Sequence, residues 1–210
     1  YVTSGKGDLV CLDKRSGEKK WALNMVTDLN GRINMFGFSQ SVLINGDLLY
    51  CTPGGPENNI VALNRFTGKL VWSQKAKGEV EAYGSPLVIR RGNRDLLLTF
   101  TELSFHGIDG KSGELLWTHP MDTAGNLHGN IPVIDGNDLI YVAGDGNRAV
   151  KLNLSDDGTA IKEVWRNQSF DNIMGGIVRI GDKIYGTAHR QMYLKELDMK
   201  TGAVTDSVKM

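Results

Sequence analysis

The sequence predicts an all-β fold built from repeated four-stranded antiparallel units, and three observations carry that prediction. A frame of turn and tryptophan recurs along the 210 residues, as in "LNRFTGKLVW" (63–72) and "IDGKSGELLW" (108–117). Short apolar stretches alternate with turns rich in Gly, Asn and Asp, which is typical of β-hairpins. No stretch between the frames shows the 3.6-residue period of an amphipathic helix.

Five copies of the frame follow one another at nearly constant spacing. The apolar residues that end the strand before each turn are 51, 45, 44 and 45 residues apart: Leu12, Leu63, Ile108, Leu152 and Leu197. An Asp or Asn follows each of them, and a turn glycine comes next: Gly17, Gly68, Gly113, Gly158 and Gly202. Four copies then end on a tryptophan: Trp21, Trp72, Trp117 and Trp165. In the fifth copy Asp206 stands at this position.

Each copy contains four strand-sized segments, so a unit of about 45 residues matches one blade of a β-propeller. The second copy predicts strands over 41–44, 48–52, 59–64 and 69–74. The third and fourth predict strands over 86–90, 95–100, 105–109 and 114–119, and over 131–135, 139–144, 149–154 and 162–167. The fifth predicts strands over 176–180, 183–188, 193–198 and 203–208.

The first copy begins one strand late. "YVTS" (1–4) aligns with "YCTP" (50–53), the second strand of its unit. We therefore predict a single domain over 1–210 with about 4.5 blades, bounded approximately at 1–26, 39–76, 84–120, 129–168 and 175–210. No spare strand at the C-terminus could complete the first blade. We expect a fragment of a longer propeller rather than a closed five-bladed ring.

The frame also predicts how each turn is built. The Asp or Asn side chain can accept backbone N–H groups two or three residues on, and the glycine then adopts the left-handed conformation that closes a turn with a bulge. Four tryptophans at one repeated position are best explained by packing between blades, with each indole N–H on a neighbouring carbonyl. The fourth copy has three extra residues between Gly158 and Trp165, so its hairpin should protrude.

Composition excludes several functional classes. Lys plus Arg and Asp plus Glu are both 24, which removes the basic excess that nucleic acid or an anionic membrane would attract. No apolar run approaches the ~20 residues of a membrane-spanning helix. Cys11 and Cys51 have no metal-ligand spacing; they are either two buried small side chains or a disulfide, which would favour an oxidising compartment.

The frame A-x-[DN]-x-x-[ST]-G-x-x-x-W resembles the tryptophan-docking repeat of the quinoprotein (PQQ) dehydrogenase-like β-propellers. "ALNRFTGKLVW" (62–72) fits it at every position, whereas Cys11, Gly107, Lys151 and Glu196 replace the Ala in the other copies. "TPGG" (52–55) and "GGIVRIGDKIYG" (175–186) look like bacterial PQQ-like repeat proteins. The resemblance is nearer to the non-enzymatic members of the family than to true PQQ dehydrogenases. The resemblance implies seven or eight blades in the complete ring and a periplasmic or outer-membrane-associated location. The start "YVTSGKGDLV" shows no secretory signal.

The resemblance leaves the function open between two classes. The first is a non-catalytic extracytoplasmic scaffold that binds a protein or a glycan and needs no cofactor. The second is a PQQ-dependent dehydrogenase that holds PQQ with Ca²⁺ at a site mostly outside this chain. The enzymes of the alcohol dehydrogenase type stack the quinone between a Trp and a disulfide of adjacent cysteines, and this chain has no Cys-Cys pair. A third alternative is a helper domain in a larger polysaccharide-processing protein.

The candidate binding residues lie in the segments that lead into each innermost strand: "NMFGFSQS" (34–41), "VEAYGS" (80–85), "GNLHGN" (125–130) and "DNIMGG" (171–176). In propellers these segments lie near one mouth of the central channel, where ligands commonly bind. Gln40, Tyr83, His128 and Asn130 are therefore predicted to converge on a ligand, or else to satisfy one another around a wet channel. His106, His119, His128 and His189 have no metal-binding or triad spacing, so we predict no catalytic residue and no metal site.

Overall fold

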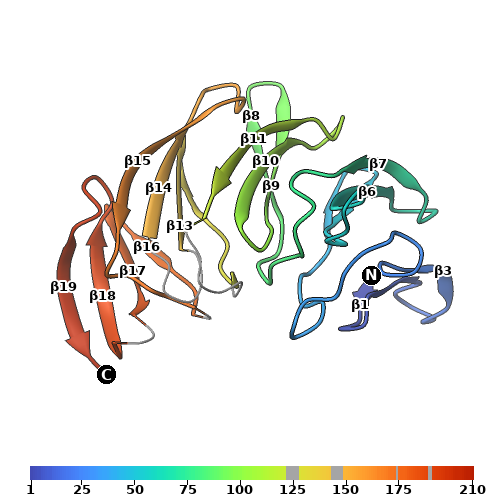
Figure 1. The fold of residues 1–210 in the computed structure, drawn as a ribbon, viewed down its shortest axis with the longest axis horizontal. Helices are drawn as coiled ribbons and strands as arrows, with labels where there is room; N and C mark the ends of the chain where they lie inside the picture. The colour runs from blue at the N-terminus through green and yellow to red at the C-terminus, as the bar shows by residue number, and fades with distance from the viewer. Residues whose placement is uncertain (122–127, 143–148, 174, 189–190) are drawn as a thin grey trace.

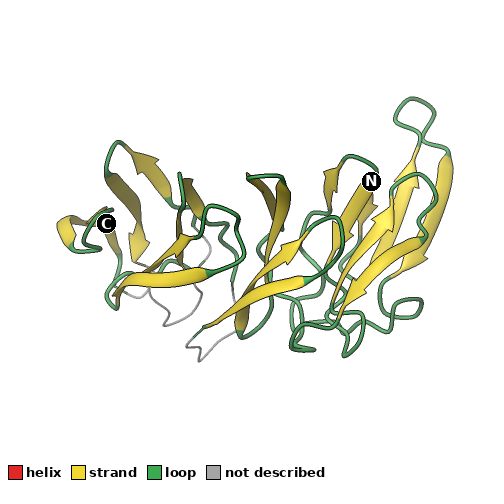
Figure 2. Ribbon diagram, turned by 90° about the horizontal axis from the view of Figure 1, so that it is seen from above, coloured by secondary structure: helices red, strands yellow, loops and turns green. Residues whose placement is uncertain are grey.

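The computed structural model describes residues 1–121, 128–142, 149–173, 175–188 and 191–210. Within these ranges the chain forms only strands and connecting loops (Figure 2). Consecutive strands pair antiparallel into five sheets, one with three strands and four with four strands. No helix of the described residues is long and apolar enough to cross a membrane. The all-β prediction is confirmed.

The strands have the following bounds. The first sheet contains β1 (Val2–Thr3), β2 (Asp8–Leu12) and β3 (Lys19–Asn24), and the second β4 (Leu43–Asn45), β5 (Leu48–Cys51), β6 (Ile60–Asn64) and β7 (Leu70–Gln74). The third contains β8 (Leu87–Arg91), β9 (Arg94–Phe100), β10 (Ser104–Asp109) and β11 (Leu115–Pro120). The fourth contains β12 (Val133–Asp135), β13 (Asp138–Val142), β14 (Ala149–Leu154) and β15 (Ile161–Asn167). The fifth contains β16 (Val178–Ile180), β17 (Lys183–Ala188), β18 (Tyr193–Asp198) and β19 (Val204–Lys209).

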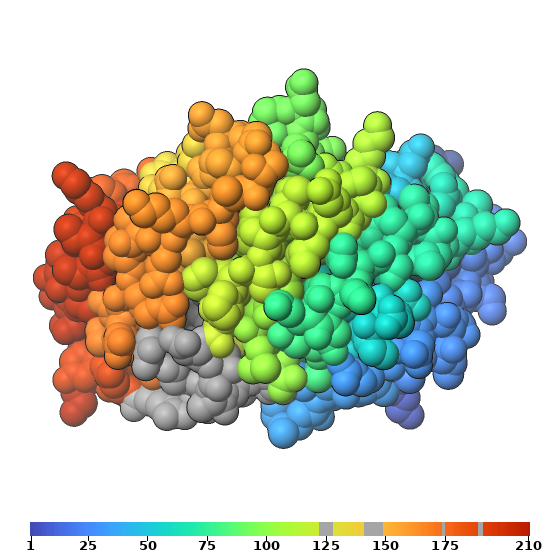
Figure 3. Space-filling view, turned by 45° about the horizontal axis from the view of Figure 1, so that its top comes forward, coloured from blue at the N-terminus to red at the C-terminus, as the bar shows by residue number. Residues whose placement is uncertain are grey.

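The five sheets follow one another in an open arc, with the N-terminal sheet at one end and the C-terminal sheet at the other (Figure 1). Each sheet packs against the next in chain order, as the successive colour bands of Figure 3 show. This is a partial β-propeller whose sheets do not close into a ring. The first sheet has only three strands, as the alignment of residues 1–4 with a second strand predicts. The predicted fourth-sheet strand over 139–144 extends beyond the described residues, which end at 142 there.

The apolar core lies between sheets rather than within any one of them. Leu9 of the first sheet packs with Leu49, Val61 and Leu63 of the second. Trp72 of the second sheet packs in turn with buried residues of the third. Because both faces of the middle sheets are covered, their central strands are almost wholly buried; in β6 only Asn64 is partly exposed. The core therefore sets the order and spacing of the sheets.

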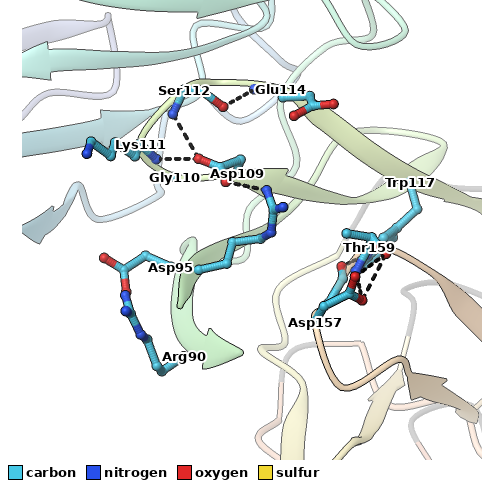
Figure 4. A network of polar contacts seen from close by, with 12 residues as sticks. Arg90, Asp95, Asp109, Gly110, Lys111, Ser112, Glu114, Trp117, Asp157 and Thr159 are labelled. Carbon is cyan, nitrogen blue, oxygen red and sulfur yellow. Dashed lines mark hydrogen bonds and ion pairs between the residues drawn. The ribbon is translucent and has the colours of Figure 1, made fainter. Parts of the chain in front are cut away.

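The turn between the third and fourth strand of a sheet has the predicted chemistry in four copies. Asp109 Oδ1 accepts the N–H groups of Lys111 and Ser112 at 3.0 and 2.9 Å (Figure 4). Backbone N–H donors around such a carboxylate favour its charged form, and with the nearby Arg94 they hold the Asp109 pKa below its usual value despite partial burial. Gly113 closes the turn at φ 78°. The register shifts between Gly107 and Ile108, which confirms the predicted bulge, and the same shift occurs in every sheet.

Each tryptophan of the frame reaches the next sheet. The indole N–H groups of Trp21, Trp72 and Trp165 donate to the carbonyls of Arg65, Gly110 and Met199 at 2.9, 3.0 and 3.0 Å. Each of these acceptors directly follows the Asx residue of the neighbouring turn. The turn glycine lies under the ring: a Cβ built on Gly68, Gly113 or Gly202 would come within 2.8 Å of the preceding tryptophan. We call this arrangement the inter-sheet joint.

The joint between the third and fourth sheets differs from the other three. Strands β14 and β15 continue past the Leu152–Glu163 pair to Leu154–Ile161, so the turn moves outward. Ser155 and Asp157 build this turn in place of Asn153, whose side chain bonds Asp138 instead. Asn153 therefore does not cap this turn, and the three-residue insertion is the reason.

The displaced turn also changes the tryptophan contact. Trp117 Nε1 donates to the carbonyl of Gly158 at 3.0 Å, and Trp117 lies beside the turn of Asp157 and Thr159 in Figure 4. Gly158 keeps a left-handed φ of 74°. A Cβ on Gly158 would meet Arg91 and Leu96, however, and not the tryptophan. Gly158 is thus a turn glycine that is not equivalent to Gly68, Gly113 and Gly202.

Candidate functional site

The four polar candidate residues lie in the connections between sheets and link these connections in series. Gln40, ahead of β4, donates its Nε2 to the Ala82 carbonyl at 2.7 Å. The N–H of Tyr83, ahead of β8, donates to the carbonyl of His128 at 3.2 Å. Asn130, ahead of β12, donates its Nδ2 to the carbonyl of Asn172 at 3.1 Å. Each connection is therefore hydrogen-bonded to the connection of the next sheet.

Three of these four side chains are buried inside the protein. The exposed fractions of Gln40, His128 and Asn130 are 8%, 0% and 4%. His128 Nε2 lies 2.8 Å from the carbonyl oxygen of Glu102, and burial lowers the His128 pKa. A ligand would have to displace protein partners to reach these groups. The direct role of the four residues in ligand binding stays a prediction, and only Tyr83 is more than marginally exposed. Residues 125–127 of the predicted segment 125–130, and residue 174 of 171–176, lie outside the described residues.

An exposed apolar loop lies next to Tyr83. Ile33, Met35 and Phe36 are 50%, 79% and 68% exposed. The Phe36 and Tyr83 ring centroids are 6.0 Å apart, and the Phe36 N–H donates to Tyr83 Oη at 3.2 Å. We call residues 33–36 the apolar loop. Sequence reasoning selected the segment 34–41 but missed these side chains; the available signal was three large apolar residues close together outside any strand pattern.

Buried contacts hold the apolar loop in place from both sides. Asn34 is buried; its Nδ2 donates to the Glu81 carbonyl at 2.6 Å, and its Oδ1 accepts the Met35 N–H at 2.7 Å. The N–H of Phe38 donates to the Gly5 carbonyl at 3.0 Å. The loop is thus tied to the first and third sheets and displays its apolar side chains from a fixed backbone.

Glu81, which accepts the Asn34 bond through its carbonyl, has an unusual side chain. The residue is fully buried, and neither carboxylate oxygen has a hydrogen-bond partner. Burial without a compensating donor favours the neutral acid and raises the Glu81 pKa to about 8. The backbone of Glu81 also forms a β-bridge with Thr101. A titratable side chain is therefore buried in the connection between β7 and β8, the connection that holds the apolar loop through Asn34.

The histidines have structural partners. His106 is buried between the hydroxyls of Thr101 and Thr118, at 2.9 and 3.0 Å, and burial lowers its pKa to about 4. His119 Nε2 lies 2.9 Å from Glu163 Oε2 across two sheets. His189 lies outside the described residues. Among the residues that the structure describes, no group of three His, Cys, Asp or Glu side chains could hold a metal ion.

The described residues do not fit a PQQ site of the alcohol dehydrogenase type. Cys11 lies on β2 and Cys51 on β5, and both thiols are free, so the disulfide alternative is wrong. Cys51 is buried, as expected, and burial raises its pKa to about 12; Cys11 is only partly buried. In the described parts of the chain there is neither the disulfide that stacks on a quinone nor a group of three His, Cys, Asp or Glu side chains that could hold a metal ion.

The fold and its joints define a repeat protein of the PQQ-like β-propeller class. A model of the family described as "Outer membrane protein assembly factor BamB" matches residues 1–206, and the chain belongs to this family. The crystal structure of BamB from Moraxella catarrhalis superposes with a TM-score of 0.71 at 17% identity; the match covers 97% of this chain and 55% of that one. That likeness shows the fold.

Curated relatives of similar sequence are enzymes. The quinoprotein alcohol dehydrogenase PedH of Pseudomonas putida is 28% identical over 130 residues, which cover 57% of this chain and 21% of the relative. A quinoprotein ethanol dehydrogenase of Pseudomonas aeruginosa is 27% identical over 150 residues, 65% of this chain and 24% of the relative. The chain therefore spans about a quarter or less of the curated relatives and about half of the BamB chain.

Proposed function

We propose that the protein is a non-catalytic, extracytoplasmic binding module that docks another protein through the apolar loop. One observation supports this proposal most directly. The side chains of Ile33, Met35 and Phe36 are 50–79% exposed, while buried contacts hold the backbone of the loop in place. Exposed apolar clusters on soluble proteins mark interaction sites. A loop that is already ordered loses little conformational entropy when it binds. Membership in the family of an outer-membrane assembly factor supports both the protein partner and the location outside the cytoplasm.

The shape of the loop indicates what the partner must offer. Phe36 lies beside Tyr83, and the exposed side chains of Met35 and Phe36 carry no charge, so the partner needs an apolar surface. Aromatic side chains dominate binding energy at interfaces of this kind. A glycan partner fits less well, because polar groups such as Gln40 and Asn130 are already bonded inside the protein.

Photo-crosslinking tests this proposal with a matched control. A photoreactive phenylalanine replaces Phe36 in one variant and Phe66 in another, since both side chains are exposed, at 68% and 60%, but Phe66 lies in an outer turn. In cells that make the full-length protein, we expect one discrete adduct from position 36 and none from position 66, and Met35→Ser should abolish the adduct. Equal adducts from both positions, or no adduct from position 36, would refute docking through the apolar loop.

The curated relatives support a second candidate function, a PQQ-dependent dehydrogenase. Adding PQQ and Ca²⁺ to the purified full-length protein tests it. Stoichiometric quinone binding with dye-linked oxidation of an alcohol would establish the enzyme and overturn the non-catalytic proposal. Absence of binding at PQQ concentrations that saturate a known quinoprotein would eliminate the enzyme.

A further inference from the structure

The third sheet has a longer hairpin between its first two strands than the other four-stranded sheets. In the second sheet the Leu48–Asn64 pair lies directly beside the β4–β5 turn, because Leu48 also pairs with Asn45 at that turn. In the third sheet the equivalent pair is Leu96–Asp109, and strands β8 and β9 continue past it. The fourth and fifth sheets resemble the second. The extension consists of two cross-strand pairs of charged residues: Arg90–Asp95 and Arg91–Arg94.

A second extended hairpin lies beside the first. The β14–β15 turn of the fourth sheet is displaced outward by its three extra residues, and a Cβ built on Gly158 would lie 3.2 Å from the Arg91 Cβ. The two hairpins lie side by side at the top of Figure 1 and of Figure 3. The joint between the second and third sheets closes on the Trp72 bond with shorter hairpins. Packing between sheets therefore does not require either extension.

The two hairpins enclose a recess of about 300 Å³, which is lined by polar side chains: Arg91, Asn93, Arg94, Asp109 and Asp157. Figure 4 shows the turns of Asp109 and Asp157 that border it. The third and fourth sheets each have four strands, so the recess lies within the arc and not at either end. Its volume is at the lower end of the range for small-molecule sites. A small polar ligand fits it best.

The recess contains a cation that is not compensated by the protein. Arg94 forms an ion pair with Asp109. The Arg91 guanidinium instead donates to two neutral acceptors, the carbonyl oxygens of Arg90 and Gly136. The buried Arg91 Nε has no hydrogen-bond partner among the described residues, and Arg91 forms no ion pair with them. The positive charge of Arg91 is therefore available to a ligand.

The recess also contains an uncompensated anion, on the fourth-sheet side. Asp157 accepts hydrogen bonds from the Ser155 hydroxyl and from the N–H and hydroxyl of Thr159. These bonds lower the Asp157 pKa to about 2, so the carboxylate stays charged. Within the described ranges Asp157 forms no ion pair. One free positive charge and one free negative charge thus line the same recess, each on a different sheet.

We infer that the recess between the β8–β9 and β14–β15 hairpins binds a small zwitterion, an α-amino acid with a small polar side chain. Its carboxylate pairs with Arg91 and accepts the Asn93 amide, while its ammonium pairs with Asp157. Charge-assisted hydrogen bonds of this kind are the strong ones. A simple anion would be repelled by Asp157 and a simple cation by Arg91, so the pair of charges selects the zwitterion. This site is separate from the apolar loop and does not rest on protein docking.

Isothermal titration calorimetry with the purified full-length protein tests the inference. The probes are L-serine, N-acetyl-L-serine, which has lost the positive charge, and L-serinamide, which has lost the negative charge. We expect saturable binding of L-serine, roughly tenfold tighter than that of either derivative and weakened by salt. Phe36→Ser in the apolar loop should leave this binding unchanged.

Two conservative variants assign each charge of the ligand to its residue. Asp157→Asn keeps an oxygen that can accept the Thr159 bonds, and it should abolish the preference for L-serine over N-acetyl-L-serine. Arg91→Gln should abolish the preference for L-serine over L-serinamide. The controls Arg15→Gln and Asp47→Asn remove the same charges from exposed turns of the first and second sheets and should keep both preferences.

Three outcomes would overturn the inference. The first is no saturable binding of L-serine, and the second is equal binding of the three probes. The third is wild-type preference in both Asp157→Asn and Arg91→Gln, which would place the ligand elsewhere on the protein.

Discussion

Tyr50 Oη and Trp72 Nε1 donate to the same acceptor, the carbonyl oxygen of Gly110, at 3.1 and 3.0 Å. Tyr1 and Trp21 share the carbonyl of Arg65 in the same way. In the fourth sheet the second donor comes from Lys151, which stands at the position of Ala62, and its Nζ shares the Met199 carbonyl with Trp165. Three joints are thus closed by two donors on one carbonyl, which stays hydrogen-bonded when either donor is lost.

This shared acceptor predicts that Tyr50→Phe and Trp72→Phe are coupled. Each single change leaves one donor on Gly110, so the lost hydrogen bond should lower the free energy of unfolding by no more than about 1.5 kcal/mol in each case, and Trp72→Phe should lose further stability because the smaller ring leaves a cavity. The double variant leaves a buried carbonyl unpaired and should lose roughly 0.5–1 kcal/mol more than the sum of the singles. Urea denaturation of the four proteins measures the coupling. Tyr185→Phe, whose hydroxyl bonds Glu196 in another sheet, should be additive with Trp72→Phe.

The turn glycines allow the packing of a joint to be separated from backbone strain. Gly17 and Gly113 have φ values of 73° and 78°, so either change to Ala incurs the left-handed penalty of roughly 1–2 kcal/mol. A Cβ on Gly17 meets nothing within 4 Å, whereas one on Gly113 would lie 2.7 Å from Trp72. We expect Gly113→Ala to reduce the midpoint of thermal unfolding clearly more than Gly17→Ala. Equal reductions would mean that the Trp72 indole can move away from the added methyl group without loss of stability.

The sequence was sufficient to predict the strands, since their signals are local. The strand predicted over 59–64 is observed at Ile60–Asn64, and that over 193–198 at Tyr193–Asp198. Asp109 and Gly113 act within a single turn, so their roles follow from spacing. The open arc and the three-stranded first sheet also followed from counting repeats.

Apart from the tryptophan contacts, which the repeat indicates, contacts between sheets could not be predicted from the sequence, because they depend on register and on the neighbouring sheet. Nothing in the sequence indicates that Tyr50 and Lys151 share acceptors with tryptophans, or that Gln40 and His128 are turned inward. The three-residue insertion was visible, but its effect on Asn153 depends on how far β14 and β15 continue to pair. The exposure of Phe36 depends on buried bonds made by Asn34, which is an interaction with a residue 47 positions away.

Gly107 provides a third prediction, because it stands where the repeat favours Ala. It pairs with Trp117, and a Cβ built on it would lie 2.0 Å from the indole Cε2. Gly107→Ala should therefore displace Trp117 from its position beside Gly158, in the turn between β14 and β15, and destabilise the protein by roughly 1–3 kcal/mol. Gly176→Ala is the control, since a Cβ there meets nothing within 4 Å. A stable Gly107→Ala variant with an unchanged tryptophan fluorescence spectrum would contradict the packing of this joint.

Glu81 predicts a specific dependence of stability on pH. Its pKa is raised from 4.5 to about 8 in the folded protein, so between these values the folded state holds a proton that the unfolded state has lost. The free energy of unfolding must then fall as pH rises, by up to about 1.4 kcal/mol per pH unit, and level off above pH 8. Below pH 6.5 His106 acts in the opposite direction, because its pKa is lowered to about 4. The Cys51 thiol contributes only above about pH 9.

The interval from pH 6.5 to 8.5 therefore isolates Glu81, and urea titrations across it test the prediction. Wild-type protein should lose stability steadily over this interval, whereas Glu81→Gln, neutral at every pH, should show a nearly flat profile. Glu57→Gln, an exposed control, should follow the wild type. Because Glu81 lies in the connection bonded to Asn34, its ionisation should also loosen the apolar loop, seen above pH 8 as lower protection from amide exchange at Met35 and Phe36 in the wild type than in Glu81→Gln. An unchanged slope in Glu81→Gln would mean that the buried carboxyl is already ionised and paired at neutral pH.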